Sequence, residues 1–245
     1  MSEPQSPDNR DFATTRWSLV AAAKLGGASE ASGRRALEQL CQAYWYPLYV
    51  FVRVRGHSPE DAQDLTQSFF ERVVLTGGFD AAEPERGRFR SYLLGAMKHF
   101  LANEWHRARA QKRGGGRAIV ELDGLEPEAR YALEPEASAN PEAGFDRVWA
   151  LETTARAMAA LRAEWKARGR EELFEALRRG LSGEGDTHAE TATRFGMTEG
   201  AVKVAAHRLR QRYQTLLRAE VAETLRDPAD IDDEMRHLVD ALRQR

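Results

Sequence analysis

Residues 187–202 have the sequence THAETATRFGMTEGAV, and these residue types predict two helices joined by a tight turn. Thr187 and Glu190 have the spacing of a capping box, in which each side chain accepts a hydrogen bond from the other residue's backbone N–H. Gly196 can adopt the positive φ that a tight turn requires, and Thr198 is placed to cap the second helix. The pattern is typical of a helix-turn-helix motif.

The second of these helices is expected to have two different faces. Residues at helical spacing predict a buried stripe: Val202, Ala205, Ala206, Leu209, Tyr213 and Leu216. The residues expected to be exposed are Gly200, Lys203, Val204, His207, Arg208 and Gln211. Because Lys and Arg bind phosphates and guanine edges, and a Val can contact a thymine methyl group, this face fits a DNA major groove. A solvated helix in an ordinary bundle is the alternative, which the turn chemistry disfavours.

The rest of the chain also predicts helices. Ala, Leu, Arg and Glu dominate and no stretch shows sustained strand alternation, so an all-α fold is expected. Helical periodicity covers these ranges: 33–55, 59–75, 91–113, 145–225 and 231–243, with turns expected inside 145–225 at Gly169, residues 182–185 and Gly196. Pro47 is expected to kink or divide the first range, and Ser58 and Pro59 have the residue types of an N-cap and a first helical position.

Composition limits the class of protein. The chain has 245 residues, of which 42% are hydrophobic, and this length allows one large domain or two small ones. Cys41 is the single cysteine, which excludes a disulfide framework, and its apolar surroundings predict a buried, unreactive thiol. No apolar run approaches the ~20 residues of a membrane span, and the N-terminal sequence MSEPQSPDNRDF lacks the apolar segment of a signal peptide. We therefore expect a cytoplasmic protein.

Charge is arranged in blocks although the chain carries only −2 overall. Residues 86–117 contain nine Lys/Arg against Glu104 alone, a net charge of +8, and residues 121–146 carry −7. Residues 199–218 carry +4 and residues 219–245 carry −4. Two basic blocks separated by an acidic spacer indicate two surfaces for a polyanion.

These patterns predict two small helical domains joined by a linker. The expected division is an N-terminal extension 1–33, a helical domain 34–113, an acidic Pro-containing linker 114–144, a helix-turn-helix domain 145–218 and an acidic extension 219–245. Two roles remain open for the front extension: an amphipathic helix near residues 15–20 that packs on the domain 34–113, and a structural cap, which is slightly preferred. Three roles remain open for the tail: a structural cap, a lid over a basic surface, and a binding site for a regulator.

Three segments, in order, resemble bacterial RNA polymerase sigma factors of the extracytoplasmic-function (ECF) class, in the sigma-70 superfamily. Residues 57–70, HSPEDAQDLTQSFF, are similar to the acidic helix of region two. Residues 89–94, FRSYLL, resemble the start of the promoter-melting helix, and residues 190–217 resemble the region-four helix-turn-helix. The resemblance covers 34–113 and 145–217, with a linker in place of region three.

The resemblance implies a specificity subunit, not an enzyme, whose partners are core RNA polymerase (the β′ clamp and the β flap) and promoter DNA. It implies polymerase contacts at Asp61, Asp64, Gln67 and Glu71. It implies contacts to the downstream promoter element at Lys98, His99, Asn103, His106, Arg109, Lys112 and Arg113. It implies contacts to the upstream element at Gly200, Lys203, Val204, His207, Arg208, Arg210 and Arg212. An anti-sigma protein or a kinase is a further candidate partner, and no cofactor or metal is expected.

The residue chemistry fits the resemblance. Helix 59–75 carries acids along its first turns, which favours a basic partner over DNA. The basic block that follows contains Tyr92 and Trp105, and cations combined with aromatic rings suit unpaired nucleic acid. The expected core positions of this block are Phe89 and Phe100, and the expected outward positions are His99, Asn103 and His106. Several positions differ from the family pattern, so no promoter sequence is implied: His99, Asn103, Thr191, Ala201 and Val204-Ala205.

Other function classes fit less well. The six histidines form no close metal-ligand pair, and Gly114-Gly115-Gly116 lacks the Lys and Ser/Thr of a phosphate loop, so an enzyme is not expected. The main alternative is a stand-alone helix-turn-helix DNA-binding regulator, which normally dimerises and leaves the acidic helix 59–75 without a role. A protein that only binds a sigma factor would not need two basic surfaces.

Overall fold

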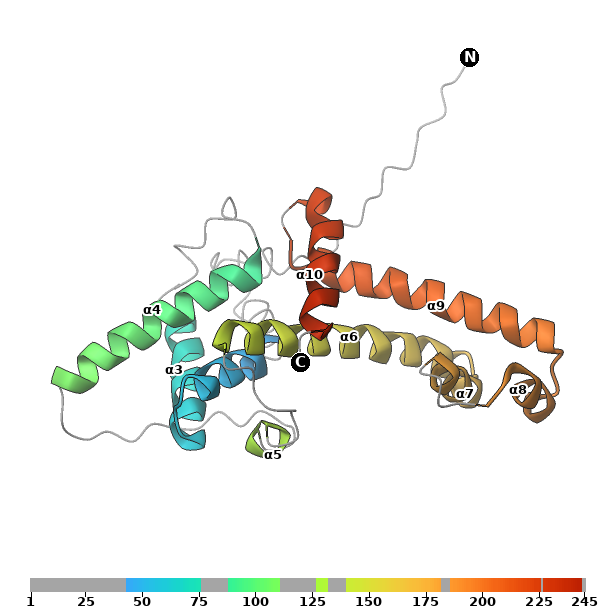
Figure 1. Cartoon of the computed structure of the whole chain (residues 1–245), viewed down its shortest axis with the longest axis horizontal. Helices are drawn as coiled ribbons and strands as arrows, with labels where there is room; N and C mark the ends of the chain where they lie inside the picture. The colour runs from blue at the N-terminus through green and yellow to red at the C-terminus, as the bar shows by residue number, and fades with distance from the viewer. Residues whose placement is uncertain are drawn as a thin grey trace, which may run out of the picture.

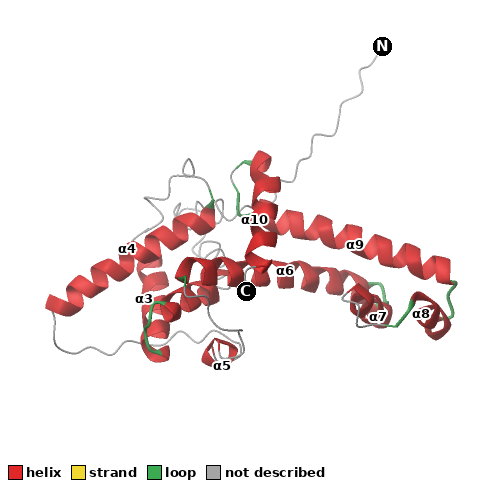
Figure 2. Ribbon diagram, viewed as in Figure 1, coloured by secondary structure: helices red, strands yellow, loops and turns green. Residues whose placement is uncertain are grey.

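The computed structural model describes residues 43–75, 88–110, 127–131, 140–181, 186–225 and 227–243. All regular structure in these ranges is helical, which confirms the all-α prediction (Figures 1 and 2). Helical residues 43–54 are followed by α3 (Pro59–Leu75), α4 (Phe89–Ala110), α5 (Pro127–Tyr131), α6 (Pro141–Ala167), α7 (Glu171–Leu181), α8 (His188–Phe195), α9 (Glu199–Ala222), the 3₁₀ turn η2 (Pro228–Asp230) and α10 (Ile231–Arg243). Within these ranges, none of the helices combines the length and apolarity needed to cross a membrane. The predictions for the extension 1–33, Cys41, Lys112, Arg113 and residues 114–126 lie outside the described residues.

Most helix ends follow from local capping. The Asp61 N–H donates to Ser58 Oγ at 3.1 Å, and α3 begins at Pro59, as predicted. Helix α6 begins at Pro141, four residues before the predicted start, because the Asn140 side chain accepts hydrogen bonds from the N–H groups of the next turn. Residues 43–54 are helical throughout, so the predicted division at Pro47 is not observed.

Two hydrophobic cores share the long helices α6 and α9, which lie side by side (Figure 1). The first core gathers residues 43–54, α3, α4, α10, the N-terminal half of α6 and the C-terminal half of α9; its fully buried side chains include Tyr44, Phe89, Phe145 and Trp149. The second core joins the other halves of α6 and α9 to α7 and α8; its buried side chains include Leu161, Phe174, Val202 and Leu209.

Two of the predicted domain limits fall inside the helices that the two cores share. The limit at 144/145 falls inside α6, whose residues Phe145 and Trp149 are buried in the first core with residues 43–54. The limit at 218/219 falls inside α9, and Val221 beyond it also belongs to the first core. Neither limit coincides with a break in side-chain contacts among the described residues.

Candidate nucleic-acid interface

The turn between α8 and α9 has the capping geometry expected from its residues. Thr187 Oγ1 accepts a hydrogen bond from the Glu190 N–H at 3.2 Å, and the Thr187 N–H donates to Glu190 Oε2 at 2.8 Å. The Thr187 N–H and the Thr187 hydroxyl both donate to Glu190 Oε2, and these two hydrogen bonds lower the pKa of the Glu190 carboxyl. Gly196 has a φ of 62°, and the Ala201 N–H donates to Thr198 Oγ1 at 3.2 Å. The helix, tight turn and helix predicted from the sequence are all present.

Helix α9 has the two faces that its periodicity predicts. Val202, Ala206 and Leu209 are buried in the second core, and Ala205, Tyr213 and Leu216 are half-buried against it. The residues predicted to bind the upstream element are all exposed: Gly200, Lys203, Val204, His207, Arg208, Arg210 and Arg212. Val204 is 49% exposed, so an apolar side chain stands among these polar ones. Gln211 is exposed as well.

The exposed cations of α9 differ in whether a carboxylate already binds them. Lys203 Nζ lies 2.7 Å from Glu199 Oε1, one helical turn earlier. The Arg212 guanidinium lies between 2.5 and 3.1 Å from the carboxylate of Glu164 on α6, which raises the pKa of Arg212. Arg208 and Arg210 have no ion-pair partner in the part of the chain that the structure describes. These two side chains are therefore the ones most ready to bind an external anion.

Helix α4 places its apolar and polar residues as expected. Phe89 and Phe100 are buried in the first core, whereas His99 and Asn103 are exposed and Trp105 is 56% exposed. Lys98 is exposed too, but its Nζ lies 2.7 Å from Glu142 Oε1 in the first turn of α6. The hydrogen bond from Lys98 lowers the pKa of Glu142. The backbones of His106 and Arg109 lie in α4, and their side chains are outside the description.

The basic block 86–117 offers fewer cations to a ligand than its net charge of +8 indicates. Arg90 is buried, with 5% exposed, and Arg88 is half-buried. Both guanidinium groups bind the carboxylate of Glu234 on α10. The net charge of the block therefore counts its charged residues correctly but overestimates how many of its cations are free to bind a ligand.

Helix α3 presents the acidic residues predicted to bind the polymerase. Asp61 and Asp64 are exposed, one turn apart on the same helix. Gln67 and Glu71 are partly buried, and the Gln67 amide donates to Glu71 Oε1 at 3.1 Å. The opposite side of α3 is anchored in the first core, where the buried Thr66 hydroxyl donates to the Ala62 carbonyl at 2.7 Å.

One group of contacts was missed from the sequence because it involves the predicted linker. Glu128 of α5 binds the Arg53 guanidinium at 2.8 and 3.0 Å and accepts a 2.6 Å hydrogen bond from the Tyr49 hydroxyl. Burial and this contact raise the pKa of Tyr49, while the Arg53 hydrogen bond lowers that of Glu128. Arg130, the single base of block 121–146, lies over the Tyr46 ring at 3.8 Å. Part of the linker is therefore docked on residues 43–54.

No protein-family model, curated protein or solved structure gives a significant match to the chain. The resemblance to sigma factors accordingly rests on the sequence motifs alone.

The turn geometry predicts opposite effects for the same substitution at two glycines. Gly196→Ala places a side chain at a φ of 62° and is expected to destabilise the protein by about 1 kcal/mol. Gly200→Ala, in the first turn of α9 with open space around its Cα, is the matched control and is expected to be neutral or stabilising. Urea denaturation measures both changes, and equal effects would contradict the assignment of Gly196 to the turn.

Proposed function

We propose that the chain is a sigma factor of the ECF class, which binds core RNA polymerase and directs promoter recognition, DNA melting and transcription initiation. The observation that carries the proposal is the order of three sequence motifs that resemble parts of region two and region four. Their exposed residues have the chemistry that the role needs, with acids on α3 and, on α9, cations that have no ion-pair partner among the described residues. The chain performs no chemistry in this role, works in the cytoplasm, and is open to control by an anti-sigma protein or a kinase.

Helix α9 is proposed to read the upstream promoter element in the major groove. Arg208 is exposed and has no ion-pair partner among the described residues, so binding a guanine edge or a phosphate costs it no existing contact. Val204 is available to a thymine methyl group, and Arg210 is available to the backbone. Lys203 and Arg212 would each have to give up a carboxylate partner, Glu199 and Glu164 respectively, to bind a DNA phosphate.

Helix α4 is proposed to hold the opened downstream element. His99 and Asn103 are exposed one turn apart, and Trp105 is exposed as well, so the helix offers both hydrogen-bonding groups and an aromatic ring. An aromatic ring can stack on an unpaired base, and single strands are bound by this combination of stacking and charge. Lys98 is proposed to join them, with His106, Arg109, Lys112 and Arg113 as further contacts from the resemblance.

Helix α3 is proposed to bind a basic surface of the polymerase through Asp61, Asp64, Gln67 and Glu71. Asp61 and Asp64 are exposed and have no cation bound to them among the described residues, so their charge is available to a partner. The same charge repels DNA, which separates this surface from the two proposed DNA surfaces.

Run-off transcription tests the proposal. Core polymerase is incubated with pooled genomic DNA fragments, with and without the chain, and discrete RNA starts that depend on the chain are expected. If such starts are missing while the chain alone retards duplex DNA, the stand-alone helix-turn-helix regulator replaces the sigma factor. If both are missing, the DNA-binding assignment of α9 fails as well.

Replacing Arg208 tests the proposed upstream contact. Arg208→Ala is expected to weaken binding of the holoenzyme to its promoter by ~1–3 kcal/mol if the contact is to a base edge. Arg178→Ala, which removes an exposed arginine from α7, is the matched control and is expected to leave binding unchanged. Fluorescence anisotropy with labelled promoter DNA measures both, and identical affinities for the two variants would sink the assignment.

Charge reversal on α3 tests the proposed polymerase contact. Asp61→Lys combined with Asp64→Lys is expected to abolish association with core polymerase, because two attractions become repulsions. The control, Glu172→Lys with Asp240→Lys, makes the same charge change at exposed sites on α7 and α10. Co-purification is the measurement, with circular dichroism to verify folding. A folded α3 variant that still co-purifies would rule this surface out.

A further inference from the structure

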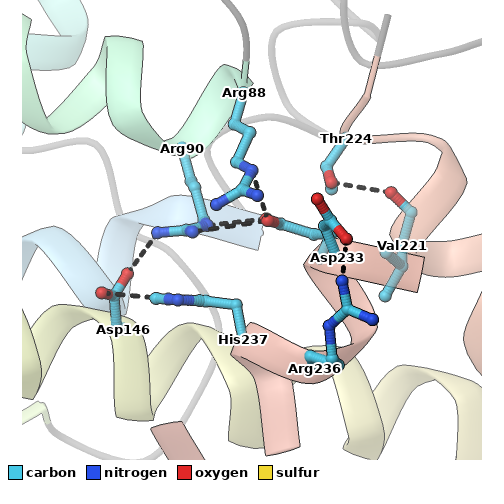
Figure 3. A network of polar contacts seen from close by, with 9 residues as sticks. Arg88, Arg90, Asp146, Val221, Thr224, Asp233, Arg236 and His237 are labelled. Carbon is cyan, nitrogen blue, oxygen red and sulfur yellow. Dashed lines mark hydrogen bonds and ion pairs between the residues drawn. The ribbon is translucent and has the colours of Figure 1, made fainter. Parts of the chain in front are cut away.

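The start of α4 is bound to the C-terminal helix through a buried ionic network (Figure 3). The Glu234 carboxylate of α10 is fully buried, with Arg90 Nε at 2.7 Å and Arg88 Nε at 2.8 Å. Arg90 also lies 2.6 Å from Asp146 Oδ1 on α6, and His237 Nε2 of α10 lies 3.1 Å from the other oxygen of Asp146. Two cations of the basic block 86–117 are thus held by acids from other helices.

Further contacts fix α10 in this place. Leu238 and Ala241 are buried in the first core, and Arg218 of α9 lies 2.7 Å from Asp232 of α10. The Phe89 N–H, at the start of α4, donates to the Thr224 carbonyl at 3.3 Å, just after α9. Helix α10 therefore covers the first turn of the helix proposed to hold the opened promoter strand.

The ionic contact between α10 and the start of α4 suits a reversible association, in which α10 also gives up the apolar contacts of Leu238 and Ala241. A buried ion pair adds little net stability, because its groups lose hydration when they meet and regain it when they separate. An apolar contact of the same size would offer no such compensation. Arg88 and Arg90 are also chemically able to bind phosphate, so nucleic acid and the Glu234 carboxylate would compete for the same two guanidinium groups.

We propose that α10 is an autoinhibitory lid, in which Glu234 occupies Arg88 and Arg90 in place of nucleic-acid phosphate. Displacement of α10 releases Arg88 and leaves Arg90 bound to Asp146 alone, which extends the DNA surface of α4 to its first turn. This inference rests on the proposed DNA-binding role of α4, but it does not require polymerase. Of the three roles that the sequence leaves open for the acidic tail, this proposal chooses the lid over a basic surface.

Affinity for a single-stranded oligonucleotide tests the lid. The wild-type chain must break the contacts of Glu234 with Arg88 and Arg90 before these cations can bind phosphate, so Glu234→Gln is expected to bind the oligonucleotide several-fold more tightly. Asp233→Asn, the neighbouring exposed acid, removes the same charge, is the matched control and is expected to keep the original affinity. Adding Arg88→Gln to Glu234→Gln is expected to remove most of the gain, because Arg90 is still bound to Asp146. An unchanged affinity in folded Glu234→Gln would overturn the proposal.

Hydrogen exchange in the unmodified chain provides a second test that depends on no variant. Saturating oligonucleotide is expected to accelerate exchange in residues 231–243, because the lid is displaced when the strand binds. Unchanged or slower exchange there overturns the proposal, as does failure of both the wild-type chain and folded Glu234→Gln to bind the oligonucleotide. The run-off assay tests the sigma role separately. If the oligonucleotide displaces α10 but no RNA start depends on the chain, only the sigma role fails. If RNA starts depend on the chain but α10 is not displaced, only the lid fails.

Discussion

The Glu234 carboxylate is fully buried, and a buried charge is costly unless cations and hydrogen bonds compensate it. Arg88 and Arg90 provide this compensation. Arg90, which makes the shorter contact, lies 144 residues before Glu234 in the sequence. The pair connects the start of α4 to α10, and Asp146 joins the first turns of α6 to the same place. The long helices α6 and α9 then extend from this point to the second core. One ionic contact thus joins segments that the sequence divides into separate domains.

Local signals allowed most helix ends to be predicted, because a cap and its helix are adjacent in the sequence. Thr187, Ser58 and Gly196 each act within four residues of their own position. Asn140 carried an equally good signal, but the acidic and proline-rich surroundings led to its assignment to the linker. The contact between Arg90 and Glu234 had no such signal, since both residues have the appearance of solvated surface charges when only their neighbours are considered.

The candidate surfaces were predictable to the extent that helical periodicity determines exposure. The alternation of Val202 and Leu209 with Lys203 and Arg208 is enough to assign the two faces of α9. Periodicity does not predict which cations are already paired, because their partners come from another helix. Glu142 and Glu164, both on α6, bind one cation of α4 and one of α9. Counting charges along a segment therefore overestimates what that segment can offer a polyanion.

The ion pairs of the chain fall into two classes with different consequences for nucleic-acid binding. Lys98–Glu142 and Arg212–Glu164 are partly exposed to solvent, and ion pairs at the surface contribute only about 0–1 kcal/mol, so a phosphate can replace the carboxylate without a change in fold. The Glu234 carboxylate has no exposed surface, so phosphate reaches Arg90 only after α10 has moved. Occupation of the proposed DNA surfaces therefore proceeds in an order set by burial: the exposed cations bind first, and the buried ones follow displacement of the helix that covers them.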